Sequence, residues 1–139
     1  MSQLSPTITF IMPLRDTQEF MVEQINAIFR FSERYAGFCE ILMLTDEIEN
    51  TRLKVASLAL RLNKASHPHV RTRIIRYTTP LGLTSLIETS INHALGQKIV
   101  ITGNMPEMAE MNKINDVLKR DILVAQNVFD VNALEKSLA

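Results

Sequence analysis

The feature that most constrains the fold is a regular alternation of short apolar runs with longer segments of helical periodicity. The apolar runs are rich in β-branched residues, and the segments that follow them have apolar residues spaced three or four apart. The four glycines and five prolines fall at the boundaries of these segments. Such alternation predicts a mostly parallel sheet whose helical crossovers cover both faces, the three-layer α/β/α class.

The periodicity predicts five strands and five helices in strict alternation. The predicted strands span residues 8–14, 38–45, 70–77, 98–102 and 122–129. The predicted helices span residues 17–35, 51–65, 84–95, 106–119 and 130 to the end of the chain. The arginines of 70–77 indicate an edge strand with one wet face. No linker or internal repeat interrupts the pattern, so residues 1–139 are predicted to form a single domain.

Composition narrows the function classes. Fifteen basic and fifteen acidic residues cancel, which argues against nucleic acid as a partner. No apolar stretch approaches the ~20 residues of a membrane span, and the first residues lack the features of a signal peptide. The single cysteine, Cys39, excludes an intramolecular disulfide and is expected to be an inert core thiol. These features together favour a cytoplasmic location.

In a parallel sheet of this kind, ligands bind beyond the carboxyl ends of the strands. Arg15 and Asp16 follow the first predicted strand, and Asp46 and Glu47 follow the second. An arginine at this place can bind a phosphate, and the carboxylates can accept hydrogen bonds from a nucleobase or ribose. The alternative reading makes these residues helix caps and solvated loop residues, and both readings stay open on the sequence alone.

Other chemistry has little support in the sequence. His67 and His69 lack a third ligand at a matching spacing, so no metal site is predicted there. The chain has no glycine-rich phosphate loop and no arrangement typical of a nucleophilic triad.

Several motifs, in order, resemble those of the family 2 glycosyltransferases, including dolichyl-phosphate mannose synthase-like members. In "ITFIMPLRDTQEF", Pro13 matches the proline that ends the family's first strand. In "EILMLTDEIENT", Asp46 and Thr51 match the second aspartate of Asp-Asp-Gly-Ser and a later threonine. Gly82 matches the glycine after the third strand, and "PE" at 106–107 matches a Pro-Glu pair.

The resemblance implies a GT-A fold, a sheet that binds a nucleotide-sugar such as a UDP- or GDP-sugar. It places the nucleotide-sugar at the strand ends, on Pro13, Arg15, Asp16, Asp46, Glu47, Gly82, Thr102 and Asn104.

The sequence also departs from the family pattern. The family's Asp-x-Asp motif, which holds a divalent ion, is replaced by Thr102-Gly103-Asn104, and Thr45 replaces the first aspartate of the base-binding pair. A hydroxyl and an amide supply no charge for Mg²⁺ or Mn²⁺, so the resemblance implies one of these ions only if the degenerate site still binds it. The resemblance also implies an acceptor-binding half with a catalytic base after the fifth strand, and the residues that follow the fifth predicted strand here are too few to match it.

These departures predict a truncated GT-A-like domain with weak or no catalytic activity of its own. The alternative is a non-catalytic assembly or regulatory module that keeps the scaffold and acts as a homodimer or with a partner protein. The edge strand and a stripe of Met105, Met108 and Met111 are the candidate surfaces for such contacts.

Overall fold

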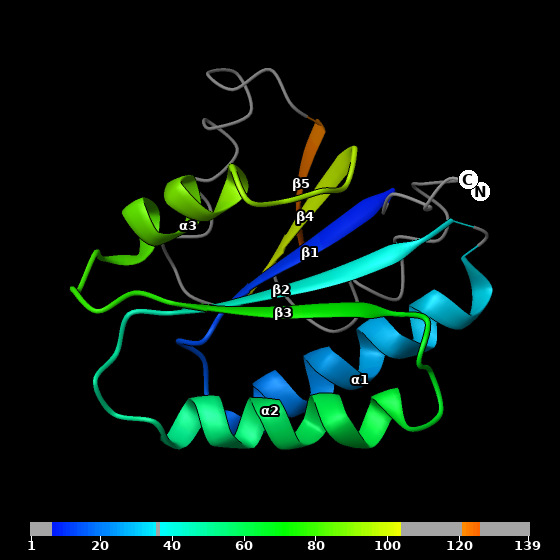
Figure 1. The fold of residues 1–139 in the computed structure, drawn as a ribbon, viewed down its shortest axis with the longest axis horizontal. Coiled ribbons are helices and arrows are strands. Elements are labelled where there is room, and N and C mark those ends of the chain that lie inside the picture. Colours follow the sequence, from blue (N-terminus) through cyan, green and yellow to red (C-terminus); the bar gives the residue numbers. More distant parts are fainter. Residues whose placement is uncertain (1–6, 36, 104–120, 126–139) are drawn as a thin grey trace.

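The structure, a computed structural model, describes residues 7–35, 37–103 and 121–125. Strands and helices alternate from β1 to β4, and the five described strands form one sheet (Figure 1). The elements are β1 (Ile8–Pro13), α1 (Gln18–Arg34), β2 (Cys39–Thr45), α2 (Thr51–Lys64), β3 (Arg71–Arg76), α3 (Leu83–Ile91), β4 (Lys98–Thr102) and β5 (Asp121–Ala125). The predicted helices 106–119 and 130 onward, residues 126–129, Asn104 and the methionine stripe lie outside the described residues.

The sheet has the order β3-β2-β1-β4-β5, and every pairing is parallel. Helices α1 and α2 cover one face and α3 covers the other, as Figure 1 shows. The predicted three-layer arrangement is therefore confirmed, and so is the prediction that the third strand lies at an edge. Among the described residues, no helix is long and apolar enough to cross a membrane.

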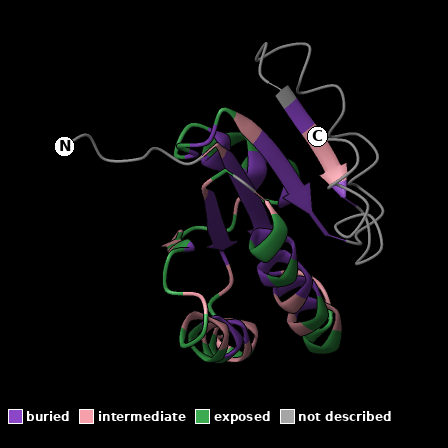
Figure 2. Cartoon of the chain, turned by 90° about the vertical axis from the view of Figure 1, so that its right-hand side faces the viewer, coloured by how far each residue is buried: buried purple, intermediate pink, exposed green. Residues whose placement is uncertain are grey.

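The core consists of two apolar layers, one on each face of the sheet. Alternate residues of a strand point to opposite faces, so Phe10 packs against α1 whereas Ile11 packs against α3. All seven residues of β2 are buried, which explains why its apolar run is continuous rather than alternating. Figure 2 shows the buried sides of α1 and α2 facing the sheet and their exposed sides facing outward. Cys39 is a core thiol, as expected, and it lies in the layer on the α1 side of the sheet. Burial raises the pKa of its thiol to about 12.

The first two helices begin where the sequence predicted. The Thr17 hydroxyl accepts a hydrogen bond from the N–H of Phe20 at 3.2 Å and so caps α1. Helix α2 starts at Thr51, whose N–H donates to the Glu49 carboxylate at 2.6 Å.

The third helix is shorter than its periodicity predicted: α3 ends at Ile91 rather than at residue 95. The reason is a competing set of hydrogen bonds in the sheet. The N–H of Leu95 donates to Glu40 at 3.2 Å, and the N–H of Gly96 donates to the Thr9 hydroxyl at 2.8 Å. These contacts direct the backbone after Ile91 toward β1, and a helix could not make them.

Glu40 is the centre of a buried polar cluster that the sequence did not reveal. Its side chain is fully buried, and its carboxylate accepts two hydrogen bonds from the Arg73 guanidinium, at 3.0 and 3.2 Å. The Thr9 hydroxyl donates to the same carboxylate at 2.9 Å. This cluster joins β1, β2 and β3 to the segment that leads into β4, because buried charge must be paired and hydrogen-bonded.

Candidate functional site

The loops that follow β1, β2 and β3 meet at the carboxyl edge of the sheet. Pro13 ends β1 and is paired in register with Leu44 of β2, so the residues that follow each strand lie next to one another. The N–H of Leu14 donates to the carbonyl oxygen of Leu44 at 2.8 Å and continues this pairing for one more residue. The predicted residues Arg15 and Asp46 come directly after this point.

Arg15 and Asp46 form an ion pair. One terminal nitrogen of the Arg15 guanidinium lies 2.7 Å from Oδ1 and 2.9 Å from Oδ2 of Asp46. The Asp46 side chain is 1% exposed and that of Arg15 is 30% exposed. Within the described structure, the Nε atom of Arg15 is buried without a hydrogen-bond partner. The Asp46 carboxylate is therefore shielded from solvent, whereas the Arg15 side chain is partly exposed.

A third loop joins this pair. The N–H of Leu81, which follows β3, donates to Oδ2 of Asp46 at 2.6 Å. Burial by itself raises the pKa of Asp46, but the N–H of Leu81 and the Arg15 guanidinium outweigh it and hold the pKa below its usual value. Asp46 is thus ionised at neutral pH and already accepts from two of its own chain's donors.

The third loop ends at Gly82, which precedes α3. Its φ of 78° lies in the left-handed region, where glycine is strongly favoured. The glycine predicted from the resemblance therefore has a local structural role, since it turns the chain from the Asp46 contact into α3.

Asp16 and Glu47 are brought together by Arg52, a residue that the sequence reasoning did not select. The Nε of Arg52 donates to the carbonyl oxygen of Asp16 at 2.8 Å, and its guanidinium lies 3.1 Å from the Glu47 carboxylate. The loop after β1 and the loop after β2 are thus joined twice, once by the Arg15–Asp46 pair and once by Arg52. The only signal in the sequence is an arginine one residue into a helix that starts beside the site.

The end of β4 has a different chemistry. Thr102 is fully buried, and its hydroxyl donates to the carbonyl oxygen of Ile11 at 3.3 Å. The Thr102 side chain is therefore hydrogen-bonded within the sheet. It lies on the face opposite to the Ile11 side chain, and it carries no charge. Asn104, the other residue predicted here, lies outside the described residues.

The described residues do not fit a divalent metal at this edge. Mg²⁺ and Mn²⁺ prefer carboxylate oxygens, whereas the hydroxyl of Thr102 is buried and donates to a backbone carbonyl. The described ranges contain no group of three histidine, cysteine, aspartate or glutamate side chains placed to hold a metal. His67 likewise belongs to no such group. Its Nε2 lies 2.5 Å from the Glu33 carboxylate, and its Nδ1 lies 3.1 Å from the carbonyl oxygen of Asn63.

Comparison with solved structures shows a likeness of fold. The fold resembles that of a mannosyltransferase from Pyrobaculum calidifontis, PcManGT, solved in complex with GDP-mannose and Mn²⁺. The TM-score is 0.50 with 17% sequence identity, over 68% of this chain and 26% of the other. The chain has a glycosyltransferase-like α/β fold.

The matched region is only about a quarter of the mannosyltransferase's length, so the likeness concerns the fold of a part of that protein and not the whole enzyme. No family model and no curated protein matches the sequence. The expected GT-A-like fold class is thus confirmed at the level of structure. The closer resemblance to dolichyl-phosphate mannose synthases remains a prediction from the motifs.

Proposed function

We propose that this chain is a nucleotide-sugar-binding domain related to the glycosyltransferases, with weak or no transferase activity of its own. The observation that supports this most directly is the convergence of the loops after β1, β2 and β3 on Asp46. A sheet of this type places its ligands at that edge, and the structural neighbour was solved with GDP-mannose.

The proposed contacts divide between the two ends of the ligand. Asp46, with Asp16 and Glu47 beside it, would face the base and ribose, because carboxylates accept hydrogen bonds from their N–H and O–H groups. Arg15 would face the diphosphate, since it keeps donors beyond those that bind Asp46 and is 30% exposed. The predicted contacts of Pro13, Gly82 and Thr102 would be made through backbone and shape.

We propose weak or absent catalysis because position 102, at the end of β4, is occupied by a threonine, which supplies no carboxylate. A bound divalent ion stabilises the charge that develops on a leaving diphosphate. Where the ligands for that ion are lacking, the sugar–phosphate bond has no comparable stabilisation, and binding without turnover is the expected outcome.

Titration calorimetry with GDP-mannose and a UDP-sugar, each with and without Mn²⁺, tests the proposal. We expect a millimolar or tighter Kd, with little change on adding Mn²⁺. Asp46→Asn should weaken binding at least tenfold, whereas Glu23→Gln on the outer side of α1 should not change it. Circular dichroism is the control that checks whether both variants are folded.

No heat at millimolar ligand with folded wild-type protein would refute the proposed binding. Binding that depends strongly on Mn²⁺ would instead refute the conclusion that the described residues of this edge do not fit a divalent metal. An assay of sugar release from the same donors separates binding from catalysis, because turnover at an ordinary enzymatic rate would contradict the non-catalytic part.

A further inference from the structure

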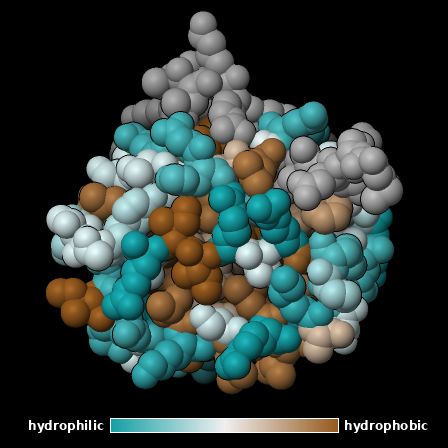
Figure 3. Space-filling model, in the orientation of Figure 1, coloured by the Kyte–Doolittle hydropathy of each residue, from teal (hydrophilic) through white to brown (hydrophobic). Residues whose placement is uncertain are grey.

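The outward face of α1 and α2 is more apolar than a solvent-exposed helical layer requires. The two helices lie side by side, and two adjoining hollows of about 420 and 280 Å³ run between them, sharing Val22 and Val55. Leu58 and Leu62 of α2 border the second hollow and are 49% and 68% exposed. Figure 3 shows hydrophobic surface among polar side chains on the side of the molecule that presents β3 and α2.

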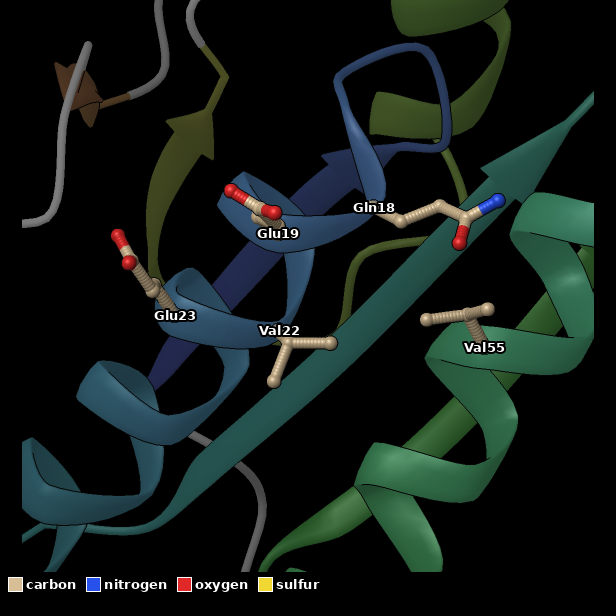
Figure 4. A pocket seen from close by; sticks show the side chains of 5 residues that line it. All are labelled: Gln18, Glu19, Val22, Glu23 and Val55. Atoms are coloured by element: carbon tan, nitrogen blue, oxygen red, sulfur yellow. The ribbon is translucent and has the colours of Figure 1, made fainter.

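The two valines point toward one another across the groove, whereas Glu19 and Glu23 of α1 point away from α2 (Figure 4). The glutamates form part of a charged stripe. At 100° per residue, Glu19, Glu23, Arg30 and Arg34 fall within about 60° of the helix circumference, and all four are exposed. The stripe is acidic in its first half and basic in its second.

The spacing of this stripe matches an antiparallel copy of itself. The midpoint between Glu19 and Arg34 and the midpoint between Glu23 and Arg30 coincide, just after Asn26. A second α1 placed antiparallel about that point would put each glutamate opposite an arginine of the other copy. A two-fold axis repeats each contact, so the register gives four ion pairs.

The same axis also aligns the exposed leucines. Val22 and Asn26 line the hollow together with Val55 and Ala59, so an axis that passes just after Asn26 crosses α2 near Leu60. Leu60 is the midpoint between Leu58 and Leu62, so Leu58 would lie opposite Leu62 of the other copy. The charged stripe lies on α1 and the two exposed leucines lie on α2, yet a single two-fold axis would pair both sets of residues between the two copies.

We propose that this face binds a second copy of the chain, with the helices of the two copies antiparallel. The formal net charge of zero adds no overall repulsion. Helices of 17 and 14 residues give a face about 25 Å long and about 20 Å wide. That size is at the lower end for specific interfaces, so the dimer is reversible. The surface differs from the edge strand and the methionine stripe, and the proposal is independent of nucleotide-sugar binding.

Sedimentation equilibrium from about 1 to 500 µM tests the proposal, and we expect a Kd in the micromolar range. Glu23→Arg places like charges opposite Arg30 and should weaken the dimer at least tenfold. Glu23→Arg combined with Arg30→Glu exchanges both charges and should restore the wild-type Kd to within about threefold. Glu88→Arg, a matched reversal on the exposed side of α3, should leave it unchanged.

Three outcomes would overturn the proposal. One is a wild-type protein that stays monomeric over the whole concentration range. Another is a dimer that Glu23→Arg does not weaken, which would place the interface elsewhere. The third is a charge exchange that fails to restore the dimer, since the antiparallel register requires restoration. Because both exchanged residues are exposed, these variants should fold as the wild type does.

Discussion

Replacing Glu40 by glutamine should destabilise the fold strongly, although the change removes only a charge and one acceptor. Glutamine keeps one oxygen but replaces the other with an NH₂ donor. In place of Oε1, the NH₂ would face the Thr9 hydroxyl, at 2.9 Å, and a terminal nitrogen of Arg73, at 3.2 Å. In place of Oε2, it would face the Nε of Arg73, at 3.0 Å. The substitution therefore removes the ion pair and leaves donors without acceptors.

The magnitude follows from the burial of each partner. Breaking a fully buried ion pair costs about 3–5 kcal/mol, and each unsatisfied buried donor costs about 1–3 kcal/mol. Glu40 is completely buried, but the Arg73 side chain is 29% exposed and can reach water once released. We therefore expect Glu40→Gln to lower the free energy of unfolding by about 2–4 kcal/mol, a large share of the 5–15 kcal/mol typical of a domain.

Urea unfolding followed by circular dichroism measures this loss as a shift in midpoint at constant slope. Glu88→Gln, on the exposed side of α3, is the control and should change stability by no more than about 0.5 kcal/mol. A loss below about 0.5 kcal/mol for Glu40→Gln would refute the claim that this cluster stabilises the fold.

Three further predictions concern pH and the backbone. Because the folded pKa of Asp46 is lowered, its contribution is complete above the unfolded pKa of about 3.9 and disappears as the pH falls below it; Arg15→Ala should reduce stability at pH 7 by about 1–3 kcal/mol and flatten this acid dependence in urea titrations. The Glu33 carboxylate raises the pKa of His67, so its contribution is complete below about pH 6.5 and is lost as the pH rises through the folded value; His67→Gln should remove that dependence from melting temperatures measured between pH 5.5 and 8.5. Gly96→Ala should cost more than Gly82→Ala in thermal unfolding, because a Cβ at Gly96 would lie 2.5 Å from a backbone nitrogen, whereas a Cβ at Gly82 meets nothing within 4 Å and strains only φ, at about 1–2 kcal/mol; equal losses would contradict this ranking.

The layout of the sheet could be predicted because it depends on local patterns. The arginines of β3 indicated an edge strand, and the sheet order agrees. The apolar run of β2 is typical of a strand covered on both faces, and all seven of its residues are buried. The end of α3 could not be predicted in the same way. It depends on Glu40 and Thr9, which lie about 55 and 87 positions from their partners Leu95 and Gly96, and periodicity contains no information about such contacts.

The candidate site shows the same division between local and distant information. Arg15 and Asp46 were selected separately, because each follows a strand, and the alternatives considered for them were a ligand contact or a cap. Their ion pair depends on the register that sets Pro13 beside Leu44, and a sequence specifies such a register only through the assembled sheet. The cluster around Glu40 was not predicted, because its partners Arg73 and Thr9 lie more than 30 positions away in the sequence.

The Arg15–Asp46 pair has a consequence for any nucleotide-sugar bound at this edge. A base that donates to Asp46 would displace a charge-assisted contact with Arg15, and a neutral hydrogen bond is weaker than the contact it replaces. A phosphate alone would likewise draw Arg15 away and leave Asp46 buried with fewer donors. Either fragment alone should therefore bind poorly, whereas a nucleoside diphosphate supplies a donor for Asp46 and an anion for Arg15 in the same step. If guanosine and pyrophosphate together bind as tightly as GDP does, the ion pair is not being opened by the ligand, and Arg15 and Asp46 are structural rather than ligand-binding residues.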